Sequence, residues 1–485
     1  MALCYKSRRV REPPLCGVGS EYGGDSTHYA DLVRGRDRLR TSQFVSCHDL
    51  KGIYYIDAPP GVGKTELILS YAKKHPSRRI CIVVFMVTTR EMVLSRIQER
   101  LGLQCEVACC NIDKMVAEWC AEYHRSGSDR TMQSFDYYEG HAVSLGLRRR
   151  VCDSEFTIFD ARAVYILSDS AIQRAWVQWV TDNYDVIYCD EAQDLSPYHA
   201  ALLKAAGDEI QRLVSVENRA AAMVYAGDSD QHIFGFICSK NVLLDEHKAP
   251  GAVSLSLQGS YRLSMGIVRI VRPLATKPLF GVNRAFTVLR NDDVGTAGEG
   301  AFIFLTNNQL LASALVFFGN LYIPGYPDLE SDEWPERLLE RVTTREQRLA
   351  LMKEGVWMSD VEKGLLKCRI SAFNQLCMFG KTPGTALRTL LKSQSVSSSC
   401  PTKTTFSTIW GYKGWQSSTI RIHPSVIAMK AGPSRRMLLM VALTRAVDGI
   451  VVSGETGTEF EAVFRLMQMP HALVNYVNEY VRFAV

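Results

Sequence analysis

Short runs of apolar residues alternate with helical patterns from about residue 50 onward. Runs that are continuously apolar and bounded by polar or glycine positions are typical of strands buried in a parallel sheet. Four such runs lie at residues 52–58, 80–87, 185–190 and 222–228. A second series lies at residues 252–257, 301–306, 418–423 and 449–454. Strands that alternate with helices predict an α/β fold, and two series predict two α/β units in one chain.

Two charged, helix-leaning stretches interrupt these series and predict helical insertions. The segment before residue 39 is rich in Arg, Gly, Pro and Ser without periodicity, which is typical of a loosely packed tail. The predicted organisation is a tail at 1–38, a first core domain at 39–95 and 166–245, a helical insertion at 96–165, a second core domain at 246–325 and 401–470, a reduced second insertion at 326–400, and a C-terminal segment at 471–485.

Composition narrows the class of protein but adds little chemistry. With 485 residues, 47% hydrophobic and 22% charged, the chain is long enough for several globular domains. The net charge of +5 permits nucleic-acid binding without arguing for it. The 14 cysteines form no CxxC pair, which argues against a zinc ribbon or an iron–sulfur cluster. No run approaches a membrane span and no signal-peptide core is present, so we expect an intracellular protein, nuclear or cytoplasmic.

A phosphate-binding loop follows the first predicted strand. The segment "APPGVGKTELIL" turns from that strand into a helical pattern. Backbone N–H groups around Gly61, Val62 and Gly63 can surround phosphates there, since glycine permits the tight turn. Lys64 brings a positive charge to the outer phosphates, and the hydroxyl of Thr65 can ligate magnesium. The order of strand, loop and helix predicts a site for ATP and Mg²⁺ rather than an incidental glycine-rich turn.

Two adjacent carboxylates end another predicted strand. The segment "YCDEAQDLS" carries Asp190 and Glu191 directly after the run at 185–190. Ligands of parallel sheets bind beyond the carboxyl ends of the strands, where the phosphate loop also lies. We therefore expect Asp190 to hold magnesium and Glu191 to polarise the water that attacks the γ-phosphate. A helix cap would need only one acid and explains the pair less well.

Several motifs, in order along the chain, resemble the UvrD/Rep/PcrA-like branch of superfamily 1 DNA helicases. They are "DEAQD", "GDSDQHIFGF", "QGSYRLS", "STIWGYKGWQ" and "VALTRAVDG". The resemblance implies two RecA-like P-loop domains in tandem that hydrolyse ATP between them. It also implies catalytic roles for Gln231, which senses the γ-phosphate, and for Arg262 and Arg445, which neutralise charge on the transferring phosphoryl group.

The same resemblance places three residues around the nucleoside. Gln43, in "LRTSQ", would read the adenine edge, and Tyr261 would stack on the base. Gln416 replaces the glutamate that holds the ribose in the family. A glutamine still bonds a hydroxyl but without the help of a charge, so we expect weaker or less selective nucleotide binding.

Five residues are expected to contact the nucleic-acid strand. Phe236 holds the place of an aromatic residue that stacks on a base, which is worth roughly 1–3 kcal/mol per base. Thr408 is expected near the strand phosphates. In the more loosely matched segment "VFMVTTREM", the same holds for Thr88, Thr89 and Arg90.

The implied function is an ATP-dependent translocase on single-stranded DNA that moves 3′-to-5′ and unwinds duplex in replication, repair or recombination. Three alternatives stay open at this point. They are a viral-type superfamily 1 RNA helicase, a translocase that strips proteins from DNA without unwinding, and an ATP-dependent binding switch whose hydrolysis has decayed. The expected partners are single-stranded DNA or RNA and no membrane, with room for a protein that loads the enzyme.

Overall fold

The computed structural model describes most of the chain between residues 50 and 452. The described residues are 50–85, 87–101, 105–126, 132–148, 156–235, 239–257, 259–282, 284, 287–290, 300–316, 321–322, 344–353, 360–382, 385–386, 404–427, 429 and 433–452. The predicted tail at 1–38 and C-terminal segment at 471–485 lie outside these ranges.

The first α/β unit is built on a six-stranded sheet with the order β3-β2-β4-β5-β1-β6, in which every neighbouring pair is parallel. Its strands are β1 (Gly52–Asp57), β2 (Ile80–Val84), β3 (Val107–Asn111), β4 (Val186–Cys189), β5 (Ala222–Gly227) and β6 (Val253–Ser256).

Helices cover both faces of this sheet, which explains why its strands are apolar at successive positions. In β1, Ile53 and Tyr55 join one hydrophobic cluster, whereas Tyr54 and Ile56 join another. Side chains alternate between the two faces of a strand, so both faces are buried. The helices on the two faces are α3 (Lys64–Lys74) and α4 (Val87–Leu101) on one, and α5 (Ile112–Arg125), α7 (Ile158–Ser168), α8 (Ser170–Asn183) and α9 (Pro197–Glu217) on the other.

The second unit repeats this plan with the strand order β11-β12-β10-β13-β14-β9, again parallel throughout. Its strands are β9 (Thr287–Arg290), β10 (Ala301–Phe304), β11 (Leu321–Tyr322), β12 (Thr404–Thr408), β13 (Ser417–Ile422) and β14 (Ala446–Val452). Its helices are α10 (Met265–Val271), α11 (Asn307–Val316), α16 (Pro424–Ile427) and α17 (Pro433–Leu443). A separate two-stranded parallel sheet pairs β7 (Gly259–Ser264) with β8 (Phe280–Val282).

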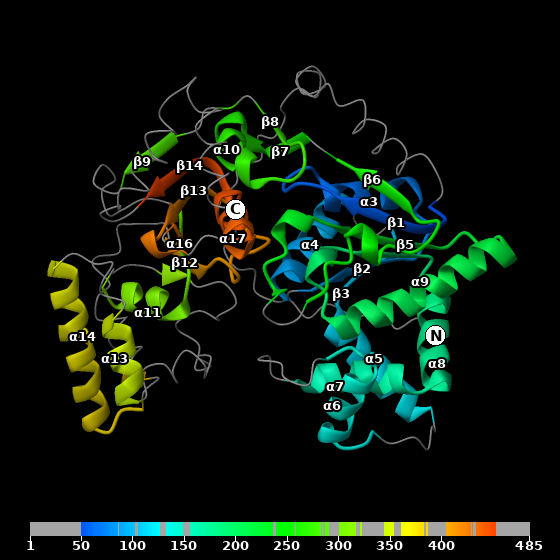
Figure 1. Ribbon diagram of the computed structural model, residues 1–485, viewed down its shortest axis with the longest axis horizontal. Coiled ribbons are helices and arrows are strands. Elements are labelled where there is room, and N and C mark those ends of the chain that lie inside the picture. Colours follow the sequence, from blue (N-terminus) through cyan, green and yellow to red (C-terminus); the bar gives the residue numbers. More distant parts are fainter. Residues whose placement is uncertain are drawn as a thin grey trace.

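Helical additions extend from both units (Figure 1). Below the first sheet lie α5 to α8, which include α6 (Phe135–Ser144), and beside α11 lie α13 (Arg345–Lys353) and α14 (Asp360–Met378). Short 3₁₀ helices complete the described elements, namely η1 (Ala192–Asp194), η2 (Ser229–Gln231), η4 (Asp245–His247) and η5 (Arg272–Leu274). Within the described ranges, no helix is both long and apolar enough to span a bilayer.

The predicted α/β class with two RecA-like units in tandem is confirmed. One strand assignment is wrong, because the run at 252–257, expected to begin the second core domain after residue 246, forms β6 and pairs with β1 of the first sheet. Apolar content shows that a strand is buried but not which neighbour it pairs with. In addition, β3 lies inside the range predicted as a helical insertion. The remaining domain boundaries stay predictions.

Candidate nucleotide-hydrolysis site

The loop between β1 and α3 has the backbone of a phosphate cradle. Gly61 and Gly63 have φ angles of +71° and +88°, in the left-handed region that favours glycine. Gly63 is the N-cap of α3 and leaves the first N–H groups of the helix without a side-chain cap. The Lys64 amine lies under the loop and donates hydrogen bonds to the carbonyls of Ala58 at 2.8 Å and Pro59 at 3.1 Å. A helix N-terminus with such donors is suited to bind phosphate.

The predicted magnesium ligands meet at the carboxyl end of β4. The Thr65 hydroxyl donates a hydrogen bond of 2.9 Å to Oδ2 of the buried Asp190. Among the described residues, no group of three or more His, Cys, Asp or Glu side chains could hold a metal ion. A hydroxyl and a carboxylate fit the oxygen preference of Mg²⁺, which typically takes its other ligands from phosphates and water. The residues present therefore fit a nucleotide-bound magnesium.

Neighbouring charges give the two adjacent acids different pKa values. Burial, followed by the charge of Glu191, raises the pKa of Asp190 to about 6. Burial acts on Glu191 too, but the positive charges of Lys413 and Lys64 outweigh it and lower the pKa of Glu191. Glu191 also has a φ angle of +55°, a costly conformation for a residue with a side chain. The Glu191 carboxylate is therefore ionised and fixed in position, and it is able to orient a water molecule.

Two arginines from the second unit enter the same region. Arg445 follows α17 and donates a hydrogen bond from Nη2 to Oε1 of Gln231 at 3.0 Å. Burial, and next the charge of Arg445, lower the pKa of Arg262 to about 9. Nε of Arg262 and Nε2 of Gln231 are both buried, and neither has a hydrogen-bond partner in the described part of the chain. An anion bound here would neutralise the converging positive charges and accept hydrogen bonds from the two buried donors.

Arg262 also packs directly on the phosphate loop. A Cβ atom added to Gly61 would lie 2.5 Å from Oγ of Ser260 and 2.6 Å from Cβ of Arg262. Only a glycine fits between the loop and β7. The two units therefore approach each other at the phosphate cradle itself.

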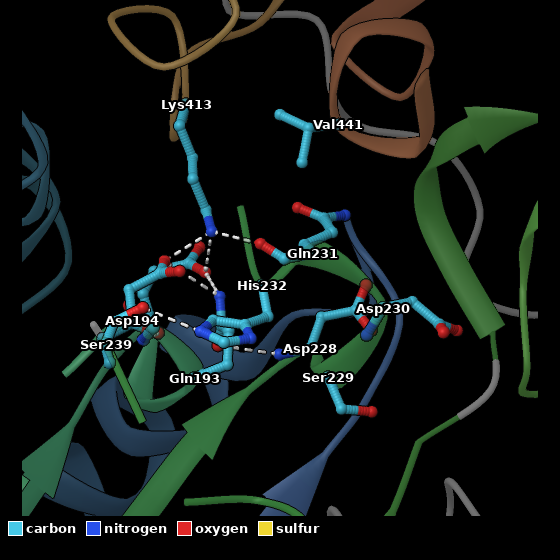
Figure 2. A network of polar contacts seen from close by, with 12 residues as sticks. Gln193, Asp194, Asp228, Ser229, Asp230, Gln231, His232, Ser239, Lys413 and Val441 are labelled. Atoms are coloured by element: carbon cyan, nitrogen blue, oxygen red, sulfur yellow. Dashed lines mark hydrogen bonds and ion pairs between the residues drawn. The ribbon is translucent and has the colours of Figure 1, made fainter. Parts of the chain in front are cut away.

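A buried lysine of the second unit joins the acidic segment to Gln231 (Figure 2). Lys413 is 2% exposed, and its amine donates hydrogen bonds to Oδ2 of Asp194 and, at 2.6 Å, to the backbone carbonyl of Gln231. The same amine lies 4.0 Å from Oε2 of Glu191. Burial raises the pKa of Asp194 to about 7 against the opposing charge of Lys413. Lys413 lies in the motif "STIWGYKGWQ", but the sequence did not predict this contact.

Gln193 connects the two acidic segments of the first unit. Its Nε2 donates to Oε2 of Glu191 at 2.5 Å and to Oδ2 of Asp194 at 3.2 Å, while its Oε1 accepts from the backbone N–H of Asp228 at 3.0 Å. A Cβ atom on Gly227 would lie only 2.0 Å from that Oε1. The side chain of Gln193 therefore fixes the relative position of the strand ends of β4 and β5.

Two of the threonines expected near the strand phosphates lie beside one turn, Thr408 at its start and Thr89, on α4, next to Gly414. Oγ1 of Thr408 accepts a hydrogen bond from the N–H of Gly411 at 3.2 Å. A Cβ atom on Gly414 would lie 3.1 Å from Oγ1 of Thr89. Lys413, which bonds Asp194, belongs to the same turn, so both hydroxyls lie close to a segment that contacts the acidic residues. Nε of Arg90 instead donates to the carbonyl of Cys109 at 3.3 Å.

The remaining residues predicted for the site cannot be placed in it from the described part of the chain. Gln43 and Phe236 lie outside the described ranges, as do the side chains of Thr88 and Tyr261. Gln416 is exposed.

Sequence reasoning missed Lys277, which bonds Asp57 and Asp228 from the second unit. A lone lysine between two predicted elements carries no signal of such a contact.

Comparison with known proteins supports the helicase resemblance. Residues 109–249 match the sequence model of the UvrD/REP helicase N-terminal domain. The search of curated proteins found no match.

Among solved structures, "The structure of PRRSV helicase" aligns with a TM-score of 0.34 and 10% identity, over 85% of this chain and 54% of the other. The Arterivirus nonstructural protein 10 helicase aligns with a TM-score of 0.32 and 10% identity, over 88% of this chain and 63% of the other. The structure of its complex with DNA aligns with a TM-score of 0.32 and 11% identity, over 89% of this chain and 65% of the other. This chain thus spans 54–65% of the length of those structures.

The matched region contains both acidic segments, "DEAQD" and "GDSDQ", and the two parallel sheets supply the fold that the motifs imply. Residues 109–249 are therefore similar to the UvrD/REP helicase N-terminal domain, within a chain built on two parallel α/β sheets.

Proposed function

We propose that the protein is an ATP-driven translocase on single-stranded DNA that moves 3′-to-5′ and unwinds duplex DNA. The observation that carries the proposal is the convergence of the two units on one site. Lys64, Thr65 and Asp190 come from the first unit, whereas Arg445 reaches Gln231 from the second. Because groups from both units form the site, hydrolysis there would depend on how the two units are placed relative to each other.

Each side chain has a distinct chemical role in this proposal. Lys64 exchanges its two loop carbonyls for phosphate oxygens, and Thr65 and Asp190 hold the magnesium ion, which neutralises phosphate charge when bound. Glu191 orients the attacking water and accepts its proton. Arg262 and Arg445 stabilise the charge that builds on the transferring phosphoryl group, an effect worth about 10³–10⁵ in rate for arginines of this kind.

The network around Lys413 supports coupling between hydrolysis and strand movement. Its amine contacts Asp194 and the carbonyl of Gln231, and its turn reaches Thr408 and Thr89. A change in the distance between Arg445 and Gln231 would shift this turn. We propose that the turn carries the change to the strand phosphates, while Phe236 holds a base by stacking.

The choice of DNA and the 3′-to-5′ polarity rest on the resemblance of "DEAQD" and "GDSDQ" to the UvrD-like branch. Roles in replication, repair or recombination are proposed on the same ground. Gln416 is proposed to bond the ribose, with Gln43 and Tyr261 at the adenine.

ATPase assays with no nucleic acid, with single-stranded DNA and with single-stranded RNA test the proposal. We expect DNA to stimulate hydrolysis most, and stimulation by RNA alone would favour the viral-type alternative. Duplexes with a 3′ or a 5′ tail test polarity, since only the 3′ tail should support unwinding. Displacement of streptavidin without unwinding would identify a protein-stripping translocase. Equal, slow hydrolysis by the wild type and Glu191→Gln would leave only a binding switch.

A further inference from the structure

A lysine of the second unit bonds two carboxylates of the first unit, close to the site but outside its predicted residues. Nζ of Lys277 lies 2.5 Å from Oδ1 of Asp57 and 2.7 Å from Oδ1 of Asp228. The side chains of Lys277 and Asp57 are 20% and 24% exposed, and that of Asp228 is 2% exposed. The two acids thus share one cation, which is partly exposed beside Asp57 and meets a fully buried carboxylate at Asp228.

Both acids lie at positions that control the site. Asp57 ends β1 and directly precedes the phosphate loop. Asp228 follows β5 and is the N-cap of η2, the short helix that contains Gln231. Asp57 also accepts hydrogen bonds from the N–H of Ser229 at 2.9 Å and from its hydroxyl at 2.8 Å. The carboxylates therefore tie the start of the phosphate loop to the start of the Gln231 segment.

The residue before Lys277 and an arginine on α17 hold the next acid of the same segment. Thr276 donates its N–H to Oδ2 of Asp230 at 2.7 Å and its hydroxyl to Oδ1 at 2.8 Å. Nη2 of Arg436 lies 3.4 Å from Oδ1 of Asp230. The second unit thus bonds Asp228 and Asp230, which flank Ser229, through contacts separate from the Arg445–Gln231 bond.

The charge arrangement favours contact between the units. Burying carboxylates without a partner is costly, and removing one member of a buried pair is strongly destabilising. Because Lys277 belongs to the second unit, separating the units would leave Asp57 and Asp228 close together without their cation. Burial raises the pKa of Asp228 even with Lys277 in place, which is consistent with a carboxylate that depends on this partner.

We propose that Lys277 is a positioning residue that clamps the second unit onto the ends of β1 and β5, so that Gln231 is held ready for the terminal phosphate. The contacts of Lys277 join groups of the protein alone, so its effect on closure does not depend on the proposed function. Its effect on hydrolysis does rest on that function. Without the clamp, nucleotide would have to bring the units together, and part of its binding free energy would be used for that closure. The apparent affinity for nucleotide would therefore fall.

The test compares Lys277→Gln, Lys277→Arg and the wild type. Lys204→Ala serves as a matched control, because Lys204 forms an exposed ion pair with Asp208 on α9. Small-angle X-ray scattering without nucleotide should give a larger radius of gyration for Lys277→Gln than for the other three proteins. Circular dichroism and the melting temperature verify folding, and the neutral, similarly long glutamine limits the loss of packing.

Steady-state ATPase kinetics then separate positioning from a structural role. We expect Lys277→Gln to raise the KM for ATP about tenfold, within the range of typical coupling between sites, with kcat within about twofold of the wild type. Lys277→Arg should restore KM. Unchanged scattering, or a fall in kcat at unchanged KM, would overturn the proposal. A wild type without ATPase activity would refute the proposed function, while scattering would still test the clamp.

Discussion

Arg445 and Gln231 lie on different α/β units and share a hydrogen bond of 3.0 Å between Nη2 and Oε1. The backbone carbonyl of the same glutamine accepts from Lys413, also of the second unit. Gln231 is thus held by the second unit through both its side chain and its backbone. Its position therefore depends on how the two units pack against each other.

This bond predicts non-additive kinetics. We expect Arg445→Ala and Gln231→Ala each to lower strand-stimulated ATPase about 10²–10³-fold, the cost of losing a donor to a developing charge. The double variant should lose less than the product of the single losses, because the two residues act as a unit. A double-mutant cycle in kcat measures this, and strictly multiplicative losses would show that the residues act independently.

Glu191→Gln should abolish most hydrolysis and preserve binding. Removing a general base typically costs about 10²–10⁴-fold in rate. Glutamine keeps the shape that accepts the bond from Gln193. ATPase assays and equilibrium binding of a fluorescent ATP analogue measure the two effects. Glu209→Gln, on the surface of α9 beside Arg212, is the control and should behave as the wild type. Retained hydrolysis in Glu191→Gln would assign the base elsewhere.

Arg262 should distinguish triphosphate from diphosphate. Burial and the charge of Arg445 lower its pKa to about 9, so the free site contains crowded positive charge. A terminal phosphate relieves this crowding. We expect a non-hydrolysable ATP analogue to raise the melting temperature more than ADP does, and Arg262→Ala to remove that difference without lowering the melting temperature of the free protein. The exposed Arg272→Ala is the control. A difference that survives in Arg262→Ala contradicts the assignment.

Asp194 should make stability depend on pH. Its pKa is about 7 in the folded chain against an ordinary value of 3.8, so the folded state binds this proton more tightly than the unfolded state does. The stabilisation is complete below pH 4 and is lost as pH rises through about 7. Relative to Asp194→Asn, the wild type should lose roughly 2–4 kcal/mol between pH 4 and 8, at about 1.4 kcal/mol per pKa unit.

Denaturant unfolding of both proteins across this pH range measures the difference, in which other titrating groups cancel. A constant difference, or one that grows in favour of the wild type at high pH, would contradict the raised pKa.

Gly61→Ala should force the units apart. Its new methyl group would meet Ser260 and Arg262 at 2.5 and 2.6 Å, and its φ angle is +71°. Gly146 has a similar φ of +69° with open space around it, so Gly146→Ala reproduces the backbone strain without the clash. We expect a fall in ATPase of at least about tenfold for Gly61→Ala only, since small misplacements in active sites are costly. Equal activity in both variants would exclude a close approach at this point.

Local sequence patterns predicted much of the fold and part of the site. The phosphate loop and the Asp190–Glu191 pair were readable because each depends on neighbours in sequence and on the rule that parallel strands end at one edge. The placement of β6 was not, because strand pairing is decided by tertiary packing. Lys277 and Lys413 were missed as partners of acids for a similar reason, since each meets its carboxylates across the interface between the units.

The bonds of Lys64 to two loop carbonyls predict a consequence for turnover. Its amine already satisfies two donors on the carbonyls of Ala58 and Pro59. We expect a bound nucleotide to replace these two acceptors with phosphate oxygens. After hydrolysis the same carbonyls compete with the departing diphosphate for the amine. We expect this competition to favour product release, a step that limits the rate in many enzymes.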